Sequence, residues 1–91
     1  MVDTFAISVD GTAVRLYRSE SNGCAVHISL PKASNSIAVG HQGVAYNDGF
    51  ILDARTDQSS HLTIQLPPGD SLWAICEPGK TQSVGVLVIE Y

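Results

Sequence analysis

The chain has 91 residues, of which 44% are hydrophobic and 15% charged, and its net charge is −4. This length corresponds to one small domain, residues 1–91, and the apolar content excludes a disordered acidic tail. The five Lys and Arg residues are scattered, which argues against nucleic acid as a partner because phosphate binding depends on clustered basic side chains. No secretory signal or membrane-spanning run is visible, so we expect a soluble protein made in a cytoplasm.

Short alternating segments separated by turn residues fill the first half of the chain. Residues 4–9 and 13–17 alternate on either side of Asp10-Gly11, which predicts an opening hairpin. Residues 24–30 (CAVHISL) and 36–40 (SIAVG) predict two further strands. The turn Asn47-Asp48-Gly49 is expected to join a short segment at residues 44–46 to residues 50–53.

The last third of the chain, residues 61–91, predicts three strands joined by two turns, at Pro67-Pro68-Gly69 and Pro78-Gly79. Three consecutive strands of this kind suggest a β-meander. Because strand side chains alternate between faces, one face is expected to build the core. Its members are Leu62, Ile64, Leu66, Leu72, Ala74, Cys76, Val84, Val86 and Val88.

These elements together predict an all-β protein, because no stretch of useful length shows helical spacing of apolar residues. The expected fold is a small antiparallel β-sandwich or barrel of about eight short strands that ends in the meander. Two packed layers are how such short strands bury their apolar sides.

The opposite face of the predicted meander is also apolar, with Trp73, Ile75, Leu87 and Ile89 in the same phase. An aliphatic patch of this breadth indicates association, either with the rest of the chain or with another subunit. These four residues and Tyr46 are therefore the candidate interface. A carbohydrate- or receptor-binding module that uses Trp73 or Tyr46 is the alternative, since aromatic rings stack on sugars.

Catalytic and metal sites find little support in the sequence. His27 and His61 fall on the polar phase of their strands and His41 in a loop, and the carboxylates Asp48, Asp53, Asp57 and Asp70 are too spread for a calcium loop. A small hydrolase or metal enzyme is the weakest alternative, because no nucleophile elbow is present, and we expect no cofactor. Cys24 and Cys76 are expected as buried thiols, with a disulfide as the other option.

Residues 25–90 carry a pattern that resembles small virion proteins of tailed bacteriophages. It runs from SIAVG through Asn47-Asp48-Gly49, LTIQL, Pro68-Gly69-Asp70 and SLWAI to Gly79 and VGVLVIE. The loop DARTDQSS lacks the Pro-Gly turn of the pattern, and no long arm precedes the first strand.

The resemblance implies a capsid decoration or head-fibre component, a compact β-sandwich that trimerises and binds the outer shell. The expected function is that of a non-enzymatic structural protein on the capsid surface of a virion. Its expected partners are copies of itself, as a homo-oligomer with a trimer favoured, and the major capsid protein.

Overall fold

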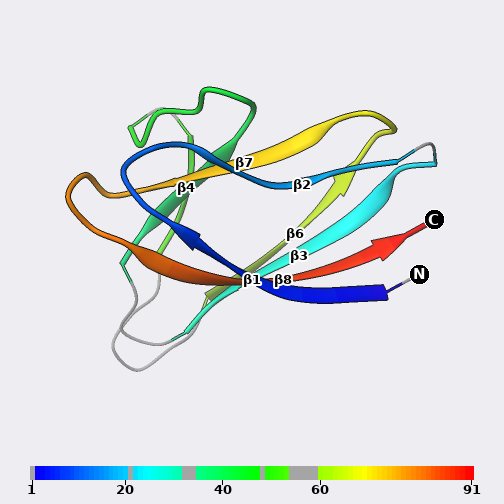
Figure 1. The fold of residues 1–91 in the computed structure, drawn as a ribbon, viewed down its shortest axis with the longest axis horizontal. Coiled ribbons are helices and arrows are strands. Elements are labelled where there is room, and N and C mark those ends of the chain that lie inside the picture. Colours follow the sequence, from blue (N-terminus) through cyan, green and yellow to red (C-terminus); the bar gives the residue numbers. More distant parts are fainter. Residues whose placement is uncertain (1, 21, 32–34, 48, 54–59) are drawn as a thin grey trace.

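The structure is a computed structural model that describes residues 2–20, 22–31, 35–47, 49–53 and 60–91. The described residues form eight β-strands and no helix, arranged as two packed sheets (Figure 1). The strands are β1 (Val2–Val9), β2 (Val14–Arg18), β3 (Cys24–Leu30), β4 (Ile37–Gly40), β5 (Phe50–Leu52), β6 (Ser60–Leu66), β7 (Ser71–Cys76) and β8 (Gln82–Glu90). The predicted all-β sandwich of eight short strands is confirmed.

Each sheet contains four strands, and all of the pairings are antiparallel. The first sheet, sheet A, has the order β1-β8-β3-β6, and the second, sheet B, has the order β2-β7-β4-β5. The chain alternates between the sheets almost every time it turns, and among the described strands β4 and β5 are the only consecutive ones that pair. Eight strands crossing between two sheets in this way form a jelly roll.

The core lies between the sheets and consists mainly of Val, Ile, Leu and Cys side chains. The inward positions of β3 (Cys24, Val26, Ile28 and Leu30) are at most 1% exposed. The predicted core face of the last third of the chain is confirmed on β7 and β8, where every residue predicted to belong to it is buried. On β6 only Leu66 is buried, whereas Leu62 and Ile64 stay half-buried because β6 is an edge strand.

The predicted meander is wrong, although its strands and turns are placed correctly. β6 pairs with β3, β7 pairs with β2 and β4, and β8 pairs with β1 and β3, so no two of the last three strands are neighbours. The turns after β6 and β7 carry the chain from one sheet to the other, and Gly69 and Gly79 adopt φ values of 83° and 81° there. A tight turn between two alternating segments can join neighbouring strands of one sheet or carry the chain from one sheet to the other, so the sequence is compatible with both.

The predicted opening hairpin is wrong for the same reason. β1 pairs with β8 and β2 pairs with β7, so the Asp10-Gly11 connection crosses between the sheets. The Asp10 side chain accepts a hydrogen bond from the Thr12 amide at 2.9 Å, and its carbonyl accepts one from the Cys76 amide at 2.7 Å. The turn is therefore fastened to β7 of sheet B rather than folded back onto β1.

The predicted pairing in the middle of the chain also differs in the structure. β5 pairs with β4, whereas residues 44–46 form no strand. Asp48 of the expected turn lies outside the described residues, and Gly49 donates its amide to the Ala45 carbonyl at 3.1 Å. Residues 44–47 therefore belong to a loop.

A hydrogen bond and a ring contact tie the two sheets together through Tyr17. The hydroxyl of Tyr17, on β2, donates to Glu90 Oε1, on β8, at 2.5 Å. The ring of Tyr17 also lies 6.4 Å from the ring of Phe5 on β1. This hydrogen bond to Glu90 is the main reason why the pKa of Tyr17 is raised to about 12.

Replacing Tyr17 with Phe removes this inter-sheet hydrogen bond and keeps the ring. We expect the free energy of unfolding in urea to fall by about 1–2 kcal/mol, as for a partly buried hydrogen bond to a carboxylate. Because the folded-state pKa of Tyr17 is raised, its contribution is complete below pH 10 and is lost as the pH rises through about 12. The wild type should therefore lose its advantage over Tyr17→Phe across that range.

Tyr91→Phe is the matched control, because the Tyr91 hydroxyl bonds Gln65 Oε1 at 2.9 Å on the exposed surface. We expect a smaller loss of stability for this variant. Equal losses for the two variants at neutral pH would contradict a special role for the Tyr17 contact.

Candidate interaction surfaces

The four strand residues of the predicted interface do not form one patch. Trp73 and Ile75 lie on the outer face of sheet B, whereas Leu87 and Ile89 lie on the outer face of sheet A. These two faces point in opposite directions because the core lies between them (Figure 1). The expected patch therefore has to be corrected to two separate half-buried pairs, since β7 and β8 belong to different sheets.

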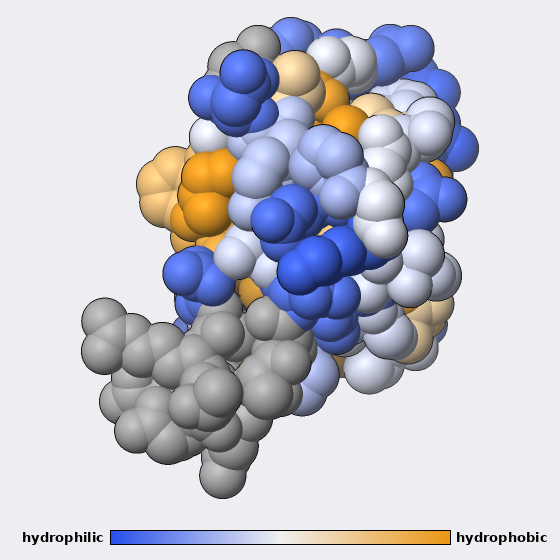
Figure 2. Space-filling model, turned by 90° about the vertical axis from the view of Figure 1, so that its left-hand side faces the viewer, coloured by the Kyte–Doolittle hydropathy of each residue, from blue (hydrophilic) through white to orange (hydrophobic). Residues whose placement is uncertain are grey.

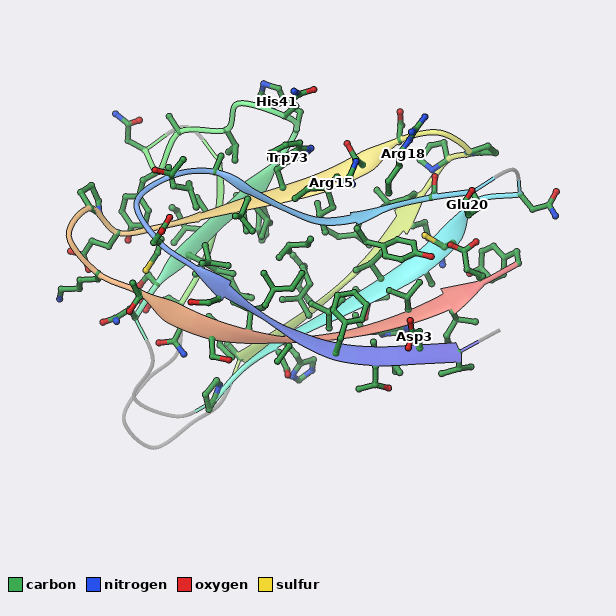
Figure 3. The ribbon with its side chains drawn as sticks, in the orientation of Figure 1. Asp3, Arg15, Arg18, Glu20, His41 and Trp73 are labelled. Carbon is green, nitrogen blue, oxygen red and sulfur yellow. The ribbon has the colours of Figure 1, made fainter. Side chains whose placement is uncertain are left out.

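Trp73 lies in the middle of sheet B and is only half-buried. It is paired with Arg15 on β2 and with Gly40 on β4. Its indole nitrogen donates to Ser71 Oγ at 3.0 Å, so its one polar atom already has a partner. Figure 3 shows Trp73 between Arg15 and His41 at this side of the molecule.

Residues 41–47 and Gly49 cover part of the same face. Val44 from this segment is 3% exposed, and Ala38 on β4 is fully buried although it points away from the core. A Cβ atom added to Gly49 would lie 2.6 Å from Val44 Cγ2 and 2.9 Å from Ala38 Cβ, so the backbone approaches the sheet closely there. The chain itself therefore shields the region beside Ile75, and Tyr46 is half-buried in this segment.

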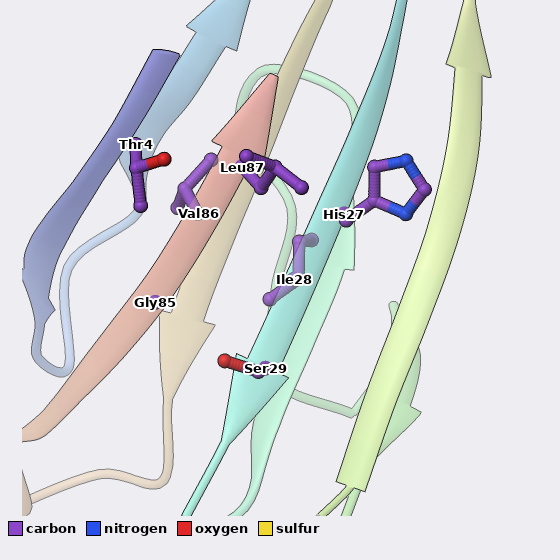
Figure 4. Close-up of a pocket in the computed structure, with 7 residues that line it drawn as sticks. All are labelled: Thr4, His27, Ile28, Ser29, Gly85, Val86 and Leu87. Carbon is purple, nitrogen blue, oxygen red and sulfur yellow. The ribbon is translucent and has the colours of Figure 1, made fainter. Parts of the chain in front are cut away.

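The outer face of sheet A carries a shallow depression of about 280 Å³ above Gly85 (Figure 4). The absence of a side chain at Gly85 creates it, and Ser29 Oγ lies only 2.7 Å from where a Cβ would be. Leu87 and Thr4 line one side, and His27 lines the other. The Nδ1 atom of His27 shares a hydrogen bond of 2.9 Å with Thr63 Oγ1, so this imidazole is held against the neighbouring strand β6.

An apolar crevice of about 300 Å³ opens at the edge of the sandwich where β5 of sheet B faces β6 of sheet A. Phe50 is 63% exposed there, and Leu62 and Ile64 are half-buried. Alternation in the sequence predicts Leu62 and Ile64 as residues of a covered core, so this crevice was not expected. The lining residues are Val39, Gly40, Phe50, Leu62, Ile64 and Leu72.

Hydrophobic groups are unevenly distributed on the surface. At the end of the molecule shown in Figure 2, hydrophilic groups dominate and hydrophobic groups gather towards one side. Across the described residues, the exposed large hydrophobic side chains are Val2, Phe50, Ile51 and Tyr91. Two of these belong to β5, next to the crevice.

The candidate metal ligands do not form a metal-binding group in the part of the chain that the structure describes. No group of three or more His, Cys, Asp or Glu side chains there is placed to hold a metal ion. His27 and His61 lie on the same outer face of sheet A, and His41 lies in the loop after β4. Every buried side-chain nitrogen or oxygen among the described residues has a hydrogen-bond partner, so none is left free for a ligand.

Membrane insertion by a helix has no support either, since the described residues include no helix of the necessary length and apolarity.

Both cysteines are buried thiols, as the sequence predicts, and neither forms a disulfide. Burial raises the pKa of the Cys24 thiol, and the nearby Glu90 carboxylate adds to the effect. Burial also raises the pKa of the Cys76 thiol. Both thiols are 0% exposed, so neither is available to a partner in the folded protein.

No protein-family model matches the sequence, and no curated protein matches it. The fold is similar to that of a solved structure described as "Bacillus endospore appendages form a novel family of disulfide-linked pili". The TM-score is 0.51 and the sequence identity 16%, over 97% of this chain and 84% of that chain. At this identity the likeness concerns the fold alone.

The burial of the cysteines gives a direct chemical prediction. A thiol reagent added to the folded protein should react no faster than the protein unfolds, because both thiols are shielded and have raised pKa values. In strong denaturant both thiols should react at once, which provides the control. Prompt labelling of either cysteine in the native protein would contradict the buried placement.

Proposed function

We propose that this protein is a non-enzymatic structural subunit that works by binding copies of itself and a larger protein assembly. The observation that supports this most strongly is the crevice between β5 and β6, where Phe50, Leu62 and Ile64 leave apolar surface uncovered. Uncovered apolar surface at the border of two sheets favours a protein partner over a small polar ligand.

The assembly we propose is the head of a tailed bacteriophage, on whose outside the chain acts as a capsid decoration protein. This part of the proposal depends on the resemblance carried by residues 25–90, with the major capsid protein as the partner. A protein that binds only the assembled shell stabilises that shell by mass action. The self-association that the resemblance implies belongs to the same proposal.

The fold similarity to a pilus protein is compatible with a structural role, because a pilus is built from repeated subunits. The related structure is described as disulfide-linked. In this chain Cys24 and Cys76 are both fully buried, so we propose that its association is non-covalent. Burial of apolar surface and backbone hydrogen bonds are then the available sources of affinity.

Density-gradient purification of particles from cells that produce this chain tests the proposal. We expect the chain to sediment with intact phage heads, and immunogold labelling to place it on their outer surface. Recovery of all of the chain at the top of the gradient, away from any particle, would overturn the capsid assignment.

The half-buried pair Trp73 and Ile75 can be tested in the same gradient. If the outer face of sheet B meets the capsid, Trp73→Ala should reduce the amount of bound chain at least several-fold, whereas Leu87→Ala on the opposite face should not. The reverse result would assign the contact to sheet A. A change in Trp73 fluorescence when sugars are added would favour the carbohydrate-binding alternative instead.

A further inference from the structure

The four free edges of the sandwich differ in how they are protected against pairing with another strand. Sheet A ends at β1 and β6, and sheet B ends at β2 and β5. An unpaired edge presents backbone N–H and C=O groups that can extend the sheet with a strand from another molecule. Proteins prevent this with short strands, bulges, proline, or charged side chains, including charges that point inward.

Three of the four edges have such protection. On β1, Asp3 pairs with Val88, so a charged residue occupies the inward phase of this edge. On β2 the register shifts between Arg15 and Tyr17, and Arg15 and Arg18 add charge. The β5 edge is only three residues long, Phe50–Leu52.

β6 has none of these protective features. Its seven residues, SHLTIQL, include no proline, no Asp or Glu, and no Lys or Arg. All seven pair with β3 without a register shift, so the strand is regular from Ser60 to Leu66. The other edge of β6 has no partner among the described residues. This long, regular and uncharged edge also borders the apolar crevice.

We propose that a second copy of this chain pairs with β6 through its own β6, antiparallel and around a two-fold axis at Thr63. Thr63 is the midpoint of the strand, so this register pairs all seven residues. It also keeps inward residues opposite inward residues, because positions related by the axis share the same parity. The two copies of sheet A then form one continuous eight-stranded sheet.

In this register, the side chains of β6 are compatible with those that the two-fold axis places opposite them. On the inner side, Leu62 lies opposite the partner subunit's Ile64, so the pair extends the apolar core across the new boundary. On the outer side, His61 lies opposite the partner subunit's Gln65, and Thr63 lies opposite its own copy. The contact brings no like charges together, and it closes the mouth of the crevice beside Phe50.

The proposed contact specifies how the self-association in the proposed function takes place, and it therefore rests on that part of the proposed function. An isologous contact of this type closes after two copies. It therefore favours a dimer over the trimer that the phage resemblance implies. The dimer can be measured on the isolated protein, so its failure is distinguishable from failure of the capsid assignment.

Sedimentation of the purified protein, with and without a charge on the edge, tests the contact. Thr63→Lys places two ammonium groups opposite each other at the axis and should raise the dimer dissociation constant about tenfold or more. Thr4→Lys is the matched control, because Thr4 occupies the same row of sheet A on the other edge strand, across Leu87 and His27. Wild type and Thr4→Lys should both sediment as dimers at micromolar concentration.

Three outcomes of this experiment would overturn the proposal. The first is a wild-type protein that stays monomeric throughout the micromolar range. The second is a dimer that Thr63→Lys and Thr4→Lys affect equally. The third is a series of larger species that grows with concentration, which would indicate head-to-tail pairing of different edges.

A cysteine variant tests the same register without relying on repulsion. In Thr63→Cys, the two new thiols face each other with Cα atoms about 4.5–5.5 Å apart, which a disulfide can span. Diamide should oxidise them to a disulfide-linked dimer, while the buried Cys24 and Cys76 remain reduced. Thr4→Cys should give no such dimer, and equal cross-linking of both variants would contradict the proposed pairing.

Discussion

The structure depends on one constraint: two sheets must cover the inward apolar sides of eight short strands with a small set of side chains. Among the described residues, the largest fully buried side chains are Ile, Leu, Val and Cys, and none of them is aromatic. Such side chains fill the space between sheets that lie about 10 Å apart. The constraint is met where strands of similar length face each other, and it fails where the three-residue β5 lies beside the seven-residue β6.

This mismatch of strand lengths connects the fold to the candidate site. β5 is too short to cover β6, so Leu62 and Ile64 are left half-buried and Phe50 is mostly exposed. The same residues would be ordinary core residues under a longer strand. The crevice is thus a consequence of how the sandwich closes. It lies beside β6, the one edge on which the described residues show no protection against pairing.

The sequence predicted strands and inward faces well, because alternation directly reports which side of a strand is apolar. It did not predict pairing, because alternation is the same whether the next strand is a neighbour or lies in the opposite sheet. Trp73 and Leu87 were predicted to share one patch because β7 and β8 were expected to be neighbours in the same sheet. In the structure they lie on opposite outer faces of the sandwich. The burial of Val44 was not predicted because its neighbours Gly40 and Gly49 offer space rather than an apolar pattern.

Pairing through β6 has a further consequence for how the protein would bind a shell. A two-fold axis perpendicular to the sheet leaves the outer faces of both copies of sheet A on the same side. The half-buried Leu87 and Ile89 and the exposed Val2 then occur twice on one broad surface. A repeated capsid lattice can contact both copies at once, and the second contact forms at a high effective concentration. Dimerisation through the main chain would therefore strengthen attachment while leaving the side chains of both outer faces free to bind.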